Sequence, residues 1–226
     1  MTAGFGSLLL QLGIPGFMAS SGGALADFVP ILARAEQVST ATMDLNRLLE
    51  FAHGRMHGRI ALARIGMHGA VVPMAQDRSP VWPPGFTGSI SHVPADRARG
   101  SDGQVIAVVA RLSDCAGVGL DLERTGMLSP EHWNSFLTAT EMAAMASRPV
   151  AQRSTLVHGL WSAKEAVMKA LQQALDPQDL EISLDDDART FSAECHLPDV
   201  DWRTGRVLVQ GRLATAPGWV AAFAMR

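Results

Sequence analysis

The sequence predicts an α+β protein that consists of two halves with a similar order of elements. Each half contains a helical segment with basic side chains, followed by a loop and then by strand-like runs. The two helical segments lie at about residues 44–66 and 161–171. No residue-level repeat relates the halves, so we expect two units, residues 1–113 and 114–226, that share a layout and not a sequence.

The composition is that of an ordinary globular protein. The chain has 226 residues, of which 47% are hydrophobic and 18% charged, so it can bury a sizeable core. Its 19 basic and 22 acidic residues give a net charge of −3, which argues against a dedicated nucleic-acid binder. Cys115 and Cys195 show no metal-ligand spacing. We expect free thiols rather than a disulfide, and a cytoplasmic location.

The N-terminal region contains an apolar run from Ser7 to Leu12 but lacks the basic start of a secretory signal. No Lys or Arg precedes Arg34, and glycine and proline interrupt the run at residues 13–16. We therefore expect a structured N-terminal segment, with strand and loop over residues 1–30 and a short helix at 30–37. No apolar stretch is long enough to span a bilayer, so we expect no membrane association.

The helical segment at 44–66 is expected to begin with Asp44 as its N-cap. Its apolar stripe comprises Leu45, Leu48, Leu49 and Ala52. His53 and His57 have the i,i+4 spacing of zinc ligands, but no third ligand is evident, so a solvated helix face explains them better. Farther along, Val105 to Leu112 is expected to form a buried strand.

The run from Gly117 to Glu123 alternates apolar and acidic residues, as a strand does. Its apolar residues share one face, which places Asp121 and Glu123 together on the other. Neighbouring carboxylates repel each other unless a cation neutralises them, and Mg²⁺ prefers oxygen ligands of this kind.

The segment from Trp161 to Leu171 is rich in strong helix formers. The residues expected on its core face are Ala163, Val167, Ala170, Leu171 and Ala174. Glu165 and Lys169 lie one turn apart on another face. Alone, they would be an exposed ion pair of little energetic consequence. Beside Asp121 and Glu123, however, Glu165 would supply a third carboxylate.

The rest of the second half contains one helix start and four strand-like runs. Thr138 and Glu141 have the spacing of a capping box, which is a sufficient structural explanation of Glu141. The strand-like runs are expected to form two hairpins, 180–184 with 190–195 and 207–213 with 219–225.

Three segments, in order along the chain, carry a family resemblance. Gly88 to His92 reads Gly-Ser-Ile-Ser-His, Gly119 to Glu123 reads Gly-Leu-Asp-Leu-Glu, and Trp161 to Lys169 reads Trp-Ser-Ala-Lys-Glu-Ala-Val-Met-Lys. Together they resemble the signature motifs of the Sfp-type 4′-phosphopantetheinyl transferases, most nearly the bacterial subgroup that includes the enterobactin-pathway enzyme. Phe51 to Arg55 also matches a Phe-x-x-Gly-Arg segment of this family. The resemblance covers about residues 46–226.

The resemblance implies the fold of these enzymes, two pseudo-symmetric α+β halves with the active site between them. It also implies a monomeric enzyme that transfers the 4′-phosphopantetheine group of coenzyme A to a serine of an apo acyl or peptidyl carrier protein, with Mg²⁺ or alternatively Mn²⁺ as its metal. The implied site residues are Asp121, Glu123 and Glu165 for the metal, Arg55, His92, Lys164 and Lys169 for coenzyme A, and Glu165, Lys169 and His92 for catalysis.

Several alternatives stay open at this point. Members of the family often have an acidic residue near the metal at the place of Glu141, so the resemblance allows this role beside capping. Glu165 can serve as a base, as a metal ligand or as both, and the carrier protein can belong to fatty-acid, polyketide or non-ribosomal peptide synthesis, the latter two serving secondary metabolism. A metal-dependent phosphohydrolase would use the same three carboxylates. A non-catalytic module that binds carrier proteins could share the same fold.

Overall fold

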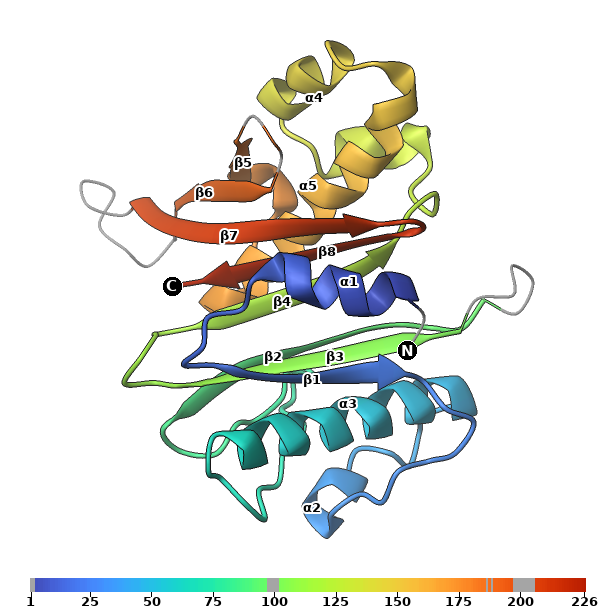
Figure 1. Cartoon of the computed structure of the whole chain (residues 1–226), viewed down its shortest axis with the longest axis vertical. Helices are drawn as coiled ribbons and strands as arrows, with labels where there is room; N and C mark the ends of the chain where they lie inside the picture. Colours follow the sequence, from blue (N-terminus) through green and yellow to red (C-terminus); the bar gives the residue numbers. More distant parts are fainter. Residues whose placement is uncertain (1–2, 97–101, 186, 188, 197–205) are drawn as a thin grey trace. The chain divides into compact units, whose positions relative to one another are not determined.

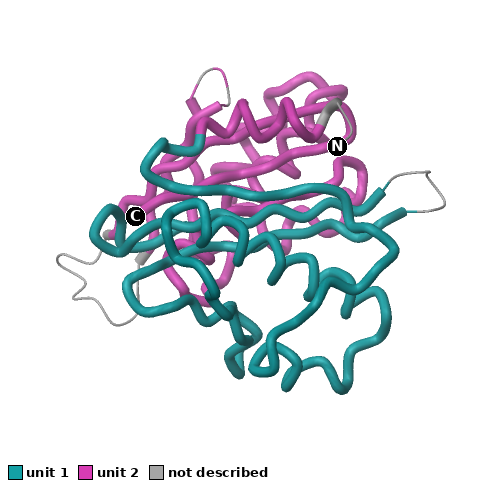
Figure 2. Tube along the Cα trace, turned by 60° about the horizontal axis from the view of Figure 1, so that its bottom comes forward, with its two compact units in different colours: residues 1, 14–118 teal, residues 2–13, 119–226 magenta. Residues whose placement is uncertain are grey.

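We analysed a computed structural model, which describes residues 3–96, 102–185, 187, 189–196 and 206–226. The chain forms two compact units (Figure 2). Unit 1 comprises Ile14–Val118, and unit 2 comprises Gly119–Arg226 together with the first helix, α1 (Ala3–Leu12). No helix of the described residues combines the length and the apolar composition needed to cross a membrane.

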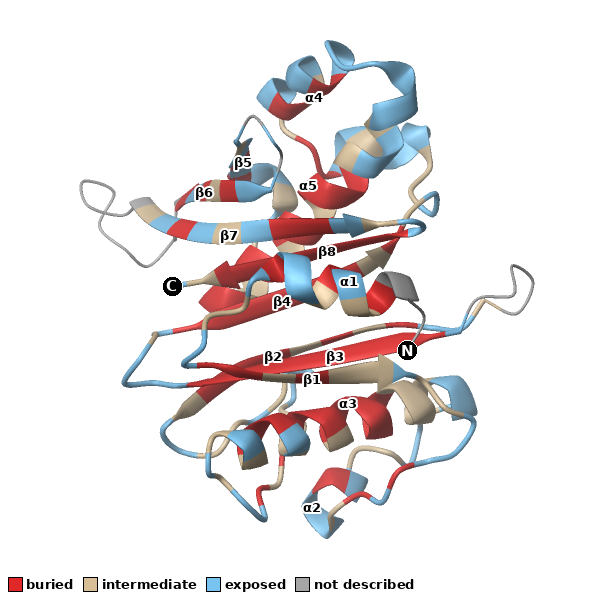
Figure 3. Cartoon of the chain, in the orientation of Figure 1, coloured by how far each residue is buried: buried red, intermediate tan, exposed pale blue. Residues whose placement is uncertain are grey.

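Unit 1 is a three-stranded antiparallel sheet with a long helix packed against it (Figure 1). The strands are β1 (Ala19–Ala24), β2 (Phe86–Val93) and β3 (Gln104–Arg111), in the order β1-β3-β2. The helices are α2 (Arg34–Gln37) and α3 (Leu45–Arg64). β3 is the central strand and is buried along almost its whole length, which explains its nearly continuous apolar sequence (Figure 3).

Two predictions for unit 1 are confirmed. The side chain of Asp44 accepts a hydrogen bond from the Arg47 N–H and caps α3 as expected. The predicted buried strand at 105–112 corresponds to β3, one residue earlier at each end.

Unit 2 is a five-stranded sheet with helices on both faces. The strands are β4 (Val118–Arg124), β5 (Leu180–Leu184), β6 (Thr190–His196), β7 (Arg206–Ala216) and β8 (Trp219–Met225), in the order β4-β8-β7-β6-β5. Both predicted hairpins are present, because β5 pairs with β6 and β7 with β8, each antiparallel. α1 contacts β7 and β8 on one face, and α5 (Val150–Leu171) packs on the other (Figure 1).

Short helical segments lead into and out of α5. A 3₁₀ helix η2 (Pro130–Ser135) and helix α4 (Ala139–Ala146) precede it, and a 3₁₀ turn η3 (Pro177–Asp179) follows it. The predicted capping box is present, with Thr138 and Glu141 each accepting the other's backbone N–H. α5 contributes a largely apolar face to the core of the unit, which is completed by side chains from β5 to β8.

Three expectations were wrong. Residues 3–12 form a helix rather than strand and loop. α5 begins at Val150, eleven residues before the segment predicted, and ends at Leu171, so Ala174 lies outside it. His53 and His57 are not on a solvated helix face, because both side chains are buried.

The two histidines attach α3 to the chain around β1. His57 Nδ1 lies 2.8 Å from the Ser21 hydroxyl, and His53 Nε2 lies 3.2 and 3.0 Å from the carbonyl oxygens of Ala26 and Phe28. A neutral His57 ring makes its contact with Ser21 without placing a charge in the interior. Burial, reinforced by the positive charges that His53 and Arg64 can carry, lowers the pKa of His57 to about 4.

A pH effect on stability follows from His57. The pKa of His57 in the folded state lies below its usual 6.5. The stabilisation that the neutral His57 ring gives to the folded state is therefore complete above pH 6.5, and it is lost as the pH falls from 6.5 toward 4. Between pH 7 and 5 this loss should be about 2 kcal/mol of unfolding free energy. Urea unfolding at both pH values should show a smaller pH dependence for His57→Gln than for the wild type. An equal dependence in the two proteins would contradict this assignment.

A buried ion pair joins α4, α5 and the start of β5. Lys164 Nζ lies 2.8 Å from Glu141 Oε2 and 2.7 Å from each of the carbonyl oxygens of Pro177 and Leu180. The other carboxylate oxygen of Glu141 accepts the Ile182 N–H at 2.9 Å. The Lys164 side chain has no exposed surface, so all three of its donors are used by protein oxygens.

Removal of one partner should leave the other charge buried and uncompensated. We expect Lys164→Met to cost about 3–5 kcal/mol of unfolding free energy. The double variant Lys164→Met/Glu141→Gln should recover part of this loss, because it removes the second charge as well. Urea unfolding of the single and double variants measures both effects. A single-variant loss below about 1 kcal/mol, the usual value of an exposed pair, would show that the pair is not a structural brace.

Candidate functional site

The candidate site of unit 2 depends on a close approach between β4 and α5. A Cβ atom placed on Gly119 would overlap the backbone carbonyl of Ala166 and would also press on the Ala170 N atom. Only glycine therefore allows the helix to lie this close to the strand. Since alternate residues of a strand share a face, Asp121 and Glu123 lie on the same side as Gly119 and face α5.

Four polar side chains and a tryptophan meet on this face. Lys169 Nζ lies 2.6 Å from Asp121 Oδ1, 3.3 Å from the Leu120 carbonyl oxygen and 3.8 Å from Glu165 Oε2. Trp161 Nε1 donates a hydrogen bond of 3.0 Å to Glu123 Oε1. Asp121 contacts the end of this helix segment at Lys169, and Glu123 contacts its beginning at Trp161, so the strand and the helix run in opposite directions here.

The electrostatics of the cluster show an excess of negative charge. Burial raises the pKa of Glu123 to about 7, and the nearby Asp121 and Glu165 carboxylates add to this effect. Burial also raises the pKa of Glu165, with a further contribution from Asp121. Burial alone would lower the pKa of Lys169, but the Asp121 and Glu165 charges outweigh it, and the net shift is upward. One ammonium therefore does not balance three carboxylates.

A divalent cation fits this group of residues in charge and in ligand type. The three carboxylates offer only oxygen donors, as Mg²⁺ prefers. The raised pKa values of Glu123 and Glu165 indicate that a further positive charge would stabilise the ionised forms of these two side chains. Within the part of the chain that the structure describes, no three His, Cys, Asp or Glu side chains already form a coordination shell. The Lys169 ammonium lies between Asp121 and Glu165 instead.

In unit 1, the predicted residue His92 belongs to a charged cluster between β2 and α3. Its Nε2 lies 2.9 Å from Arg47 Nη1, and its Nδ1 lies 3.6 Å from Glu50 Oε2. The same Arg47 nitrogen lies 3.2 Å from Glu50 Oε2. The sequence analysis did not assign Glu50 to a site. Its position three residues after Arg47, on the same helix face, was the only signal for it.

Arg55 is a buried arginine rather than a surface one. Only 5% of its surface is exposed, and its guanidinium carbon lies 4.3 Å from the centre of the Phe51 ring. Its Nε is buried and has no hydrogen-bond partner among the described residues. Burial lowers the pKa of Arg55 to about 10, and the negative charge of Glu36 partly opposes this shift. A buried cation without a bonded acceptor can gain strongly from an anionic ligand.

The predicted site residues thus fall into two groups, one in each unit, and Lys164 belongs to neither. Arg55 and His92 belong to unit 1, where they lie on α3 and β2. The predicted metal ligands Asp121, Glu123 and Glu165 meet Lys169 in unit 2. Lys164 lies on the buried side of α5, and protein oxygens accept all of its hydrogen bonds. We therefore replace its predicted phosphate contact with a structural role.

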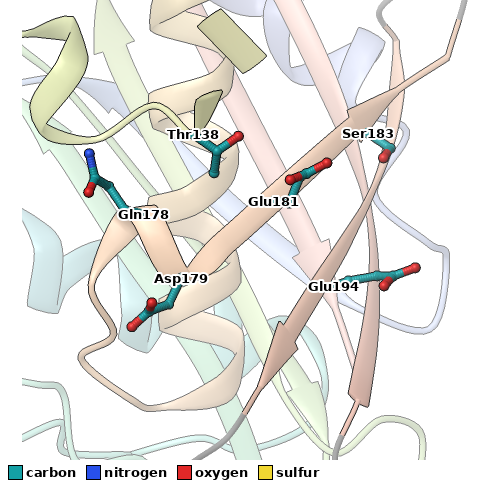
Figure 4. Close-up of a pocket in the computed structure, with 6 residues that line it drawn as sticks. All are labelled: Thr138, Gln178, Asp179, Glu181, Ser183 and Glu194. Atoms are coloured by element: carbon teal, nitrogen blue, oxygen red, sulfur yellow. The ribbon is translucent and has the colours of Figure 1, made fainter. Parts of the chain in front are cut away.

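A separate pocket of about 610 Å³ in unit 2 includes none of these residues (Figure 4). Its lining residues are Thr138, Gln178, Asp179, Glu181, Ser183 and Glu194. Glu181 of β5 and Glu194 of β6 are directly opposite each other in the sheet. A lining with this much negative charge does not suit a ligand with several phosphates.

Comparisons with known proteins agree with the motifs. The chain matches the family model of the 4′-phosphopantetheinyl transferase N-terminal domain over residues 34–99, and that of the 4′-phosphopantetheinyl transferase superfamily over residues 117–224. It is also 33% identical over 179 residues to the 4′-phosphopantetheinyl transferase Svp of Streptomyces mobaraensis. That alignment covers 76% of this chain and 69% of the relative.

Two solved structures show a weaker likeness. The holo-[acyl-carrier-protein] synthase of Thermotoga maritima has a TM-score of 0.36 and 17% identity, over 49% of this chain and 62% of that one. The holo-ACP-synthase of Plasmodium yoelii has a TM-score of 0.40 and 19% identity, over 49% of this chain and 93% of that one. This chain therefore spans less than two thirds of the first structure.

The two family models match most of the chain, and they include the residues of both clusters described above. The relative from Streptomyces mobaraensis aligns over more than two thirds of its own length. From these matches, the chain belongs to the 4′-phosphopantetheinyl transferase superfamily.

Proposed function

We propose that the protein transfers the 4′-phosphopantetheine group of coenzyme A to a serine of an apo carrier protein, in a reaction that depends on Mg²⁺. The products are the holo carrier protein and adenosine 3′,5′-bisphosphate. The observation that carries the proposal is the cluster of three carboxylates and one ammonium between β4 and α5. Such a cluster can handle a pyrophosphate, which brings negative charge and requires cations around it.

The reaction needs a base for the serine and a cation for the leaving group. The serine oxygen attacks the phosphorus that carries the pantetheine arm, and the bond from this phosphorus to the bridging oxygen breaks. Glu165 accepts the serine proton, directly or through water, and its raised pKa makes it a better base than an exposed glutamate. Lys169 donates to the oxygen on which negative charge develops.

A metal would act together with these side chains. Mg²⁺ or Mn²⁺ held by Asp121, Glu123 and Glu165 would neutralise the non-bridging oxygens and orient the pyrophosphate. The hydrogen bond from Trp161 fixes the Glu123 carboxylate and thereby limits the directions in which it can offer its oxygens.

Unit 1 would bind the nucleotide part of coenzyme A. The buried Arg55 guanidinium offers planar donors that suit the 3′-phosphate. His92 would hydrogen-bond to a phosphate oxygen, and Arg47 and Glu50 hold its ring in place. The carrier protein would supply the serine that accepts the phosphopantetheine group.

The proposed function is tested by incubating the protein with coenzyme A, Mg²⁺ and a panel of apo carrier proteins. Intact mass should show the gain of one phosphopantetheine, EDTA should abolish it, and Mg²⁺ or Mn²⁺ should restore it. Glu165→Gln should slow transfer by at least about 100-fold. Glu181→Gln, an exposed glutamate on β5, is the matched control and should keep the wild-type rate. Full transfer in excess chelator would refute the metal, and hydrolysis of coenzyme A without transfer would favour a phosphohydrolase.

Arg55→Ala should weaken the binding of coenzyme A by about tenfold or more, the loss expected for a charge-assisted phosphate contact. Dephospho-coenzyme A lacks the 3′-phosphate, so its binding should change little. Calorimetric titration of both ligands measures the difference, and thermal melts confirm folding. Arg34→Ala, an exposed arginine of α2, is the control. Equal losses for the two ligands would mean that Arg55 serves only to stabilise unit 1.

A further inference from the structure

We propose that Lys169 and the divalent cation compete for Asp121, so that Lys169 must leave this carboxylate before the cation can bind there. Lys169 is then released toward the phosphates on which it is needed. The inference rests on the proposed function, because it assumes a cation at the carboxylates. It adds to that function an order of two steps. The cation binds to the carboxylates first, and the displaced Lys169 ammonium then becomes available to the phosphates.

The contacts of the ammonium carry this inference. Lys169 Nζ has three donors, and two of them go to atoms of β4, the Asp121 carboxylate at 2.6 Å and the Leu120 carbonyl at 3.3 Å. The nearest oxygen of Glu165 is 3.8 Å away, beyond a good hydrogen bond. The ammonium is therefore bound to the strand carboxylate that the proposed function assigns to the cation. Two cations held by the same carboxylate would repel each other strongly in this partly buried place.

The Lys169 side chain is accessible to solvent, whereas that of the other lysine of the chain is not. The chain contains two lysines, Lys164 and Lys169, and both lie on α5. The Lys164 side chain is completely buried, whereas the side chains of Lys169 and Glu165 are each 30% exposed. A cation can thus reach the carboxylates from solvent, and the flexible stem of Lys169 lets its ammonium turn away without a change in the helix.

The same geometry corrects a simple expectation about Lys169. An ammonium is not a metal ligand, so its removal would be expected to leave metal affinity nearly unchanged. If Lys169 competes for Asp121, its removal must instead tighten cation binding. The competition also predicts that cation binding makes the Lys169 amine more accessible to reagents in solution, because the amine leaves its contacts with the Asp121 carboxylate and the Leu120 carbonyl.

The first experiment measures Mn²⁺ binding by calorimetry or electron paramagnetic resonance, without coenzyme A or carrier protein. Lys169→Met keeps the length and packing of the side chain and removes its charge. It should bind Mn²⁺ at least about tenfold more tightly than the wild type, since a single ion pair in a partly buried site commonly has this effect. Asp121→Asn in the Lys169→Met background should abolish the gain, because the contested carboxylate is gone.

The second experiment measures labelling of the wild-type amines by an amine-specific reagent, followed by peptide mass analysis. Lys169 should react faster when Mg²⁺ is present, and Lys164 should stay protected in both conditions as an internal control. This readout does not depend on turnover, so it separates competition from a loss of catalysis.

The outcomes distinguish the inference from the proposed function. Tighter binding by Lys169→Met and faster labelling with Mg²⁺ would support the competition. Wild-type Mn²⁺ binding with no gain in Lys169→Met, or labelling that Mg²⁺ does not change, would refute the competition and leave the metal site standing. Failure of both proteins to bind Mn²⁺ would overturn the metal site and the inference together.

Discussion

The contact of α5 with β4 at Gly119 is the constraint on which the candidate site depends. Without a side chain at this residue, the helix backbone at Ala166 can rest directly against the strand. The short distance brings the helix side chains Trp161, Glu165 and Lys169 to the acidic residues of β4. A larger residue at Gly119 would push the helix outward, and the polar cluster would open even though every one of its members remained.

The buried pair of Lys164 and Glu141 complements this contact from the other side of the helix. Gly119 sets how near α5 lies to the strand, whereas the Lys164 ammonium ties the helix to α4 and to the start of β5. Adjacent residues of one helix thus serve different purposes. Lys164 is enclosed and holds the helix, and Glu165 points into the polar cluster. Replacement of such a buried pair by well-packed apolar side chains is often neutral for stability, whereas removal of one partner is strongly destabilising.

Much of this arrangement could be predicted from the sequence, because local patterns determine it. The alternation of β4, the cap at Asp44 and the capping box of α4 depend on residues within a few positions of one another, and all were predicted correctly. The motif residues of β4 and α5 were also expected to form one cluster, and the structure places them together.

The errors arose where distant parts of the chain decide the outcome. His53 and His57 are buried because their partners lie 25 to 36 residues earlier, around β1. The role of Lys164 depends on carbonyl groups 13 and 16 residues later. The N-terminal helix belongs to unit 2 because it packs against β7 and β8, near the end of the chain. The sequence of that helix, with two glycines in its first four residues, gives little local indication of such a contact.

The opposed glutamates of the β5–β6 hairpin affect how copies of the protein behave toward one another. β5 is at the edge of the five-stranded sheet, and an edge strand offers unpaired backbone groups to any other strand. Glu181 on β5 and Glu194 beside it give this edge a local negative charge that opposes the approach of the same edge from a second molecule. Acid or high salt weakens this repulsion. The Glu141 and Lys164 side chains already occupy the Ile182 N–H and the Leu180 carbonyl of β5, so the repulsion protects only the backbone groups of this edge that remain unbonded.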